Sequence, residues 1–286
     1  MTATPTVIGT HVEVPRVEDR AALGIGRVAL DIWLLAERNL LKIWRNKRLI
    51  VFSTVQPIMQ LVLFVFVFGA IAALGLPGIS YKDFVVPAVI IQTVVFTGVQ
   101  SGIGIADDLN TGMIDRFRSL PIARSGFLLG RTLSDTLRLV YQIIILLVVA
   151  TAVGFRFHGG ALGAMAMPFV AILFGMSLIT FSEFIGLTVQ DPETVQAAVF
   201  IPLLPLIFTS SAFAPISRLP SWMQGAARIN PVTSAIDTAR GLALGDTRLY
   251  QVSQVHLATA ALRFGAAVII ITGLFTWLAV RKYRKI

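Results

Sequence analysis

The chain has 286 residues, of which 56% are hydrophobic and only 14% are charged, and it contains no cysteine. Its mean hydropathy of +0.80 is too high for a soluble globular domain. The lack of cysteine excludes disulfides, thiolate metal sites and a cysteine nucleophile. The apolar runs are continuous and about 20 residues long, which is typical of membrane-spanning helices and not of a β-barrel. The sequence therefore predicts an all-α integral membrane protein.

The N-terminal region divides into a tail and a helix. Residues 1–24 have no periodicity, and we expect them to form a flexible cytoplasmic tail. Over residues 26–47 a helical pattern gathers basic residues, among them Arg38 and Lys42, on one stripe, and apolar residues cover much of the remaining surface. This pattern predicts an interfacial amphipathic helix that lies along the inner membrane surface.

Six apolar segments follow, and we expect residues 25–286 to form one transmembrane domain. The predicted spans are residues 49–74, 84–105, 133–155, 167–189, 195–213 and 262–280. Lys and Arg gather before the first span, between the second and third, and after the sixth, whereas Lys82 and Arg156 stand alone in the first and third loops. By the positive-inside rule both termini are cytoplasmic.

Short helices are expected in the outer connection between the fifth and sixth spans. Residues 220–228 form an amphipathic pattern. Asn230 followed by Pro231 predicts an N-cap and a first-turn proline that open a second helix, which ends near Gly245. On the cytoplasmic side, the short turn at residues 190–193 contains Asp191 and Glu193.

The longest charged interruption between two spans is residues 107–131. Gly112 can bend the chain, and residues 113–119 can form about two helical turns before Pro121. The result is a short amphipathic helix in a cytoplasmic loop. Spacing alone leaves open whether this helix meets lipid headgroups or docks on a protein.

Reactive chemistry is sparse. No Gly-Lys pair occurs, so a phosphate-binding P-loop is excluded. His11, His158 and His256 are far apart, and the sequence predicts neither a metal site nor a catalytic site. Asp107, Asp108 and Asp115 could hold Mg²⁺ and a diphosphate, as in a membrane enzyme, but the chain offers no second acidic cluster.

Polar residues inside the spans leave two interpretations open. The amides could line a transport path or form hydrogen bonds between helices; they are Gln56, Gln60, Gln92, Gln100 and Gln142. Glu183 is an acidic residue within the fourth span. An ion-coupled carrier would need such a group, but its position near the cytoplasmic end favours a local pairing or a hydrated site.

Two motifs resemble a known family. The stretch GMIDRFRSLPIAR at residues 112–124, followed by a loosely matched Gly, Asp and Arg pattern at residues 130–138, resembles the permease subunits of ABC-2 type exporters, especially the daunorubicin-resistance permease family. NPVTSAIDTARGLALG at residues 230–245 resembles that family's pattern before the last span. The overall plan is also similar from about residue 25 onward.

This resemblance implies a transport subunit and not an enzyme. The family exports drugs, antibiotics or lipids across the cytoplasmic membrane, powered by two separate ATPase subunits that bind ATP and Mg²⁺, with no cofactor in the permease itself. Six spans imply a second permease copy or a homologous partner. Membrane lipid is the other expected partner, and the net charge of +9 reflects topology and not nucleic-acid binding.

The resemblance also implies site residues. The loop between spans two and three becomes the coupling helix, and the short turn at residues 190–193 becomes a second contact with the ATPase. The expected ATPase contacts are Asp115, Arg116, Phe117, Arg118, Leu120 and Pro121 in the loop, and Asp191 and Glu193 in the turn. Spans two and five become the walls of the substrate path, with the residues Gln92, Phe96, Gln100, Leu206, Thr209 and Phe213. The alternatives are an ABC-2 permease for a polysaccharide or lipid-linked glycan and, from other classes, an ion-coupled carrier or a lipid-modifying membrane enzyme.

Overall fold

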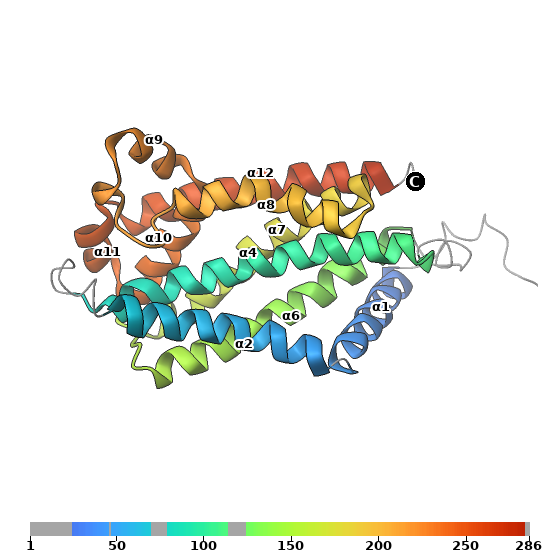
Figure 1. The fold of residues 1–286 in the computed structure, drawn as a ribbon, viewed down its shortest axis with the longest axis horizontal. Helices are drawn as coiled ribbons and strands as arrows, with labels where there is room; N and C mark the ends of the chain where they lie inside the picture. Colours follow the sequence, from blue (N-terminus) through green and yellow to red (C-terminus); the bar gives the residue numbers. More distant parts are fainter. Residues whose placement is uncertain (1–24, 46, 70–78, 114–123, 284–286) are drawn as a thin grey trace, which may run out of the picture.

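The chain forms a bundle of helices (Figure 1). A computed structural model describes residues 25–45, 47–69, 79–113 and 124–283, and every regular element in these ranges is helical. Within them, four helices are long and apolar enough to cross a membrane. These are α4 (Tyr81–Asn110), α6 (Arg124–Ala152), α7 (Gly160–Val189) and α12 (Leu257–Tyr283). The predicted all-α membrane class is confirmed.

Two shorter apolar helices lie where the first and fifth spans are expected. The first is α2 (Lys47–Leu63), which contains Pro57 and continues into a π-helical turn, η2 (Phe64–Phe68). The second is α8 (Pro192–Phe208). Because a helix of 17 residues is about 26 Å long, α8 is short for a 30 Å hydrocarbon core. The count of six spans therefore stays a prediction.

The two ends of the bundle carry different structures (Figure 1). At one end, the α1 end, lie α1 (Ile25–Arg45), the last turn of α4, the connection between α7 and α8, and the C-terminal end of α12. At the other, the α10 end, lie α9 (Ser221–Ile229), α10 (Pro231–Leu244) and α11 (Asp246–Ser253). The expected interfacial helix is α1, and it exposes Leu30, Trp33 and Leu34 by more than half of their surface. The two expected outer helices are α9 and α10, whereas α11 was not predicted.

Asn230 begins α10 and also completes α8. Its Oδ1 accepts a hydrogen bond from the Val232 N–H at 2.8 Å, as its N-cap position predicts. Its Nδ2 donates to the Leu206 carbonyl at 2.6 Å, which satisfies a group that the end of α8 leaves free. One side chain therefore caps two helices.

The centre of the bundle is α4, which packs along α7. In the apolar 18-residue stretch of α4, 89% is buried inside the bundle, compared with 11% of the corresponding stretch of α12. Glycines allow the close approach: a Cβ on Gly98 would lie 2.9 Å from the Leu178 Cβ, and one on Gly102 would overlap the Ser182 carbonyl. Gly186 meets the Gly102 backbone in the same way. Such small residues allow helix backbones to touch where lipid provides no hydrophobic drive.

A buried ion pair fixes α10 against the bundle. Arg240 is fully buried and donates to the Asp237 Oδ1 at 3.2 Å, to the Phe84 carbonyl at 3.1 Å and to the Ser211 carbonyl at 3.1 Å. Its guanidinium also lies 3.8 Å from the centre of the Phe84 ring. Burial lowers the pKa of Arg240 to about 10. Because this value is still well above neutral pH, the group stays charged.

We predict that Gly102→Ala destabilises the bundle, because the added methyl group overlaps backbone that cannot move alone. Overpacking of this kind costs about 1–3 kcal/mol. The measurement is thermal unfolding in detergent. The matched control is Gly273→Ala on α12, where a Cβ would meet nothing within 4 Å; it should unfold at or above the wild-type temperature. Equal midpoints for both variants would contradict the close α4–α7 contact.

Asp237→Ala is expected to be more damaging. It leaves the Arg240 charge buried without its carboxylate, and breaking a buried pair costs about 3–5 kcal/mol. Asp246→Ala is the control, because the Asp246 side chain is 51% exposed and its removal leaves no buried charge. A large drop in unfolding temperature for the first variant and a small one for the second would support the role of the pair.

Candidate functional site

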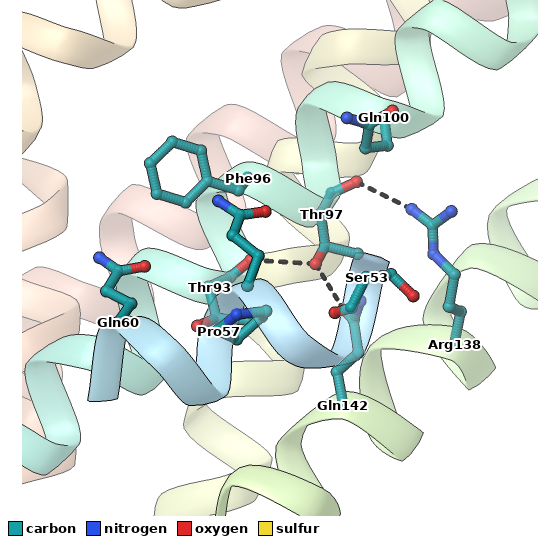
Figure 2. A pocket seen from close by; sticks show the side chains of 10 residues that line it. Ser53, Pro57, Gln60, Thr93, Phe96, Thr97, Gln100, Arg138 and Gln142 are labelled. Atoms are coloured by element: carbon teal, nitrogen blue, oxygen red, sulfur yellow. Dashed lines mark hydrogen bonds between the residues drawn. The ribbon is translucent and has the colours of Figure 1, made fainter. Parts of the chain in front are cut away.

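A polar cleft lies between α2, α4 and α6 (Figure 2). Its cavity volume is about 190 Å³, which is smaller than a typical site for a whole drug-sized molecule. Its lining is rich in amides and hydroxyls: Ser53, Gln56, Pro57, Gln60, Thr93, Phe96, Thr97, Gln100, Arg138 and Gln142.

Hydrogen bonds across the polar cleft connect its three helices. The Thr97 hydroxyl donates to the Gln142 Oε1 at 2.6 Å, and the Gln142 Nε2 donates to the Ser53 carbonyl at 3.1 Å. Gln60 and Gln92 join α2 to α4 by a hydrogen bond of 2.7 Å. Gln60, Gln92 and Gln142 therefore form hydrogen bonds between helices and also border a cleft, and the interpretation of the amides as a transport path stays a prediction.

An aromatic cleft adjoins the polar cleft and shares Gln60 and Phe96 with it. It lies between α2 with η2, α4 and α8 and has a cavity volume of about 460 Å³, which is within the range of sites for drug-sized molecules. Rings and aliphatic side chains dominate its lining: Gln60, Phe64, Phe68, Tyr81, Gln92, Phe96, Leu204, Ile207, Phe208 and Phe213. Phe213 joins the rings, with centroids 5.4 Å from Phe64 and 6.0 Å from Phe208.

The predicted path residues divide between the clefts and the core. The four residues that line a cleft are Gln92, Phe96, Gln100 and Phe213. Leu206 and Thr209 do not line either cleft: Leu206 packs against the main core, and the Thr209 hydroxyl donates to the Pro205 carbonyl at 2.7 Å. On α8 it is Leu204, Ile207 and Phe208 that face the aromatic cleft.

The sequence analysis named Gln56, Gln60 and Gln142 as possible path residues, but it missed Ser53 of α2 and Arg138 of α6. Ser53, Gln56 and Gln60 recur at helical spacing on α2, a signal that could have placed them on one face. Nothing in the sequence distinguishes Arg138, which faces the polar cleft, from the neighbouring charges of α6.

A second polar cluster, the α4–α6 charge cluster, lies toward the α1 end. Arg131 forms an ion pair with Asp108, donates to the Gly104 carbonyl at 3.1 Å, and has its Nε 3.6 Å from the Asp135 Oδ2. Asp135 also accepts a hydrogen bond from Ser101 at 2.6 Å. These contacts connect the end of α4 to the start of α6.

Glu183 of α7 lies beside this cluster. It is 3% exposed, and both its oxygens accept from the Thr132 hydroxyl, at 2.9 and 3.0 Å. The local pairing that the sequence favours for Glu183 is thus present, although its partner is a hydroxyl. Asp135 pairs with Arg131, four residues earlier on α6, whereas Arg138, three residues later, donates to the Thr97 carbonyl.

The predicted ATPase contacts at residues 115–121 lie outside the described residues. The remaining two, Asp191 and Glu193, are exposed at the α1 end. Asp191 caps α8 by accepting from the Thr194 N–H at 2.8 Å. The hydroxyl and N–H of Thr194 lower the pKa of Asp191 below its ordinary value, so the carboxylate is ionised and faces outward.

Comparison with known proteins identifies the family. The family model of the ABC-2 type transporter matches residues 31–244, which include both clefts and the α4–α6 charge cluster. The chain belongs to the ABC-2 type transporter family. Membership agrees with the apolar helices, and the chain is a multi-pass membrane protein.

Individual ABC-2 relatives are named as drug-resistance or multidrug permeases. The daunorubicin resistance ABC transporter permease protein DrrB1 of Streptomyces coeruleorubidus is 31% identical over 80% of this chain and 77% of its own length. The probable doxorubicin resistance ABC transporter permease protein DrrC of Mycobacterium tuberculosis is 23% identical over 74% and 76%. The probable multidrug ABC transporter permease YbhR of Escherichia coli is 23% identical over 60% and 47%.

We predict that Phe96→Ala weakens the binding of an apolar fluorescent probe to the purified ABC-2 protein by about tenfold, because Phe96 contributes to both clefts and an aromatic contact is worth about 1.4 kcal/mol. Phe169→Ala is the matched control, since Phe169 on α7 is 60% exposed and borders neither cleft. An equal loss of probe affinity in the Phe96→Ala and Phe169→Ala variants would show that the probe binds outside the clefts.

Proposed function

We propose that the chain is the membrane-spanning permease subunit of an ATP-driven exporter that moves a hydrophobic or amphipathic substrate, such as a drug, antibiotic or lipid, out across the cytoplasmic membrane. Family membership and the names of the relatives support this proposal. Two partner ATPase subunits bind ATP and Mg²⁺, and a second permease copy or a homologue completes the path.

The observation that carries the proposal is the pair of adjoining clefts along α4. Together they offer amides on one side and aromatic rings on the other, so that a molecule with both polar and apolar parts can satisfy both. The aromatic cleft ends on α8, the predicted fifth span. Movement of α8 and α2 relative to α4 would open the clefts alternately to the two sides of the membrane.

In sequence, the predicted coupling helix joins two of the helices that border the clefts, α4 and α6. It belongs to the segment between Asn110 and Arg124, and the helices on both sides of that segment are tied together by Arg131. A movement of the ATPase that displaces this segment would therefore shift α4 and α6 as a unit. In this proposal the α1 end faces the cytoplasm, and the turn at Asp191 and Glu193 gives the ATPase a second contact.

We expect Phe117→Ala to abolish most ATP-driven transport while leaving membrane insertion intact, because an apolar anchor at a docking surface carries much of the binding energy. The measurement is affinity purification in mild detergent, with mass spectrometry of the co-purified proteins and an ATPase assay on the eluate. A P-loop protein that accompanies the wild type should be lost from the variant.

The control is Gln254→Ala, an exposed position at the α10 end. It should retain the P-loop partner and the ATPase activity. Wild-type protein that purifies alone and without ATPase activity under several mild conditions would refute the exporter proposal. Normal transport by Phe117→Ala would refute the docking role of that residue alone.

A further inference from the structure

Arg138 gives the clefts their charge. Among the described residues that line the polar or the aromatic cleft, it is the one charged side chain. It extends from α6 across the polar cleft, with its guanidinium near Thr97 and toward Gln100 (Figure 2). The site is therefore positive at one end and apolar at the other.

The charge of Arg138 is not neutralised by the described carboxylates around it. Asp135, one turn earlier on α6, is held by Arg131 and by Ser101, and Asp108 is held by Arg131. Glu183 accepts from Thr132. Arg138 forms no ion pair with any of these carboxylates.

The guanidinium also has donors to spare. It makes one hydrogen bond, from Nη2 to the Thr97 carbonyl at 3.3 Å, and its buried Nε has no hydrogen-bond partner among the described residues. A guanidinium carries five N–H donors in a planar fork that matches a carboxylate or phosphate. Arg138 is partly buried, and a partly buried cation with free donors is stabilised when an anion pairs with it.

The apolar part of the site extends away from Arg138 along α4. The α4 residues that line the two clefts run from Tyr81 to Gln100, a stretch about 28 Å long at the rise of an α-helix. α4 begins at Tyr81 toward the α10 end and runs toward the α1 end (Figure 1), so Gln100, which lies beside Arg138 in Figure 2, is at the end of the cleft nearer to α1. The length suits an elongated molecule whose head and body differ in polarity.

We infer that the joined clefts bind an anionic amphiphile, whose carboxylate or phosphate head pairs with Arg138 and whose apolar body lies among the rings of the aromatic cleft. The inference rests on the proposed function, because it names the substrate class of that same site. With the α1 end in the cytoplasm, the bound molecule has the orientation of an amphiphile in the inner leaflet. A cationic amphiphile of equal size is disfavoured by charge repulsion, and a neutral one leaves the guanidinium donors unmatched.

The test compares three probes of equal chain length with carboxylate, alcohol and amine heads. Their binding to the purified complex, in a zwitterionic detergent at fixed salt, is measured by quenching of a fluorescent group on the chain. We expect the wild type to bind the carboxylate at least tenfold more tightly than the amine. Equal affinity for the two would overturn the inference.

Variants separate the role of Arg138 from general damage. Arg138→Gln should reduce the affinity for the carboxylate to that for the alcohol while leaving alcohol binding unchanged, and Arg138→Lys should keep part of the preference. Arg263→Gln, an exposed charge on α12 that borders neither cleft, is the matched control and should keep the full preference. If the Arg138→Gln variant still binds the carboxylate probe more tightly than the alcohol and amine probes, the inference is overturned.

Competition identifies the source of the anion. Displacement of the carboxylate probe by vesicles that contain a phosphate-headed lipid would indicate a membrane lipid, and displacement by soluble acids alone would indicate an acidic small molecule; each supports the inference. ATP-driven transport in proteoliposomes is measured separately. A charge preference without transport would refute the exporter proposal alone, and transport without a charge preference would refute this inference alone.

Discussion

Contact between the backbones of α4 and α7 is the constraint on which the rest of the structure depends. Between apolar helices in a membrane, lipid competes equally well for every leucine, so close packing must hold the helices together. Gly98, Gly102 and Gly186 provide it by letting the two backbones touch. With α4 fixed in this way, one of its faces is left to border α2, α6 and α8, and both clefts lie on that face.

Several polar side chains inside the bundle hold neighbouring helices together through hydrogen bonds or ion pairs. Gln142 connects α6 to α4 and α2, and Arg131 connects the ends of α4 and α6. Arg240 performs the same task at the α10 end through two backbone carbonyls and a carboxylate. Arg138 is the exception among the described arginines inside the bundle, since its one hydrogen bond uses little of its capacity. The number of partners therefore separates Arg131 and Arg240, which join helices, from Arg138, for which we infer a ligand.

Much of the fold could be predicted from the sequence, because the signals are local. Continuous apolar runs predicted α4, α6, α7 and α12, and the Asn230-Pro231 pair predicted the start of α10. The site could be predicted less well. α8 is apolar on all sides, so periodicity could not show that Leu204 faces the cleft while Leu206 faces the core. Partners far apart in the chain, such as Gln60 and Gln92, leave no mark in local spacing.

The contrast between the enclosed α4 and the exposed α12 has a consequence for how the sequence can change. Side chains of α12 such as Leu262, Ile269 and Ile270 are exposed by at least 65%, and hydrocarbon accepts one aliphatic residue as readily as another. Their shapes are therefore interchangeable as long as they stay apolar. On α4 even one added methylene must displace packed neighbours. Among relatives, substitutions should therefore accumulate on α12 and be rare along α4. Differences on α12 would then record descent, whereas similarity along α4 would indicate a common mechanism.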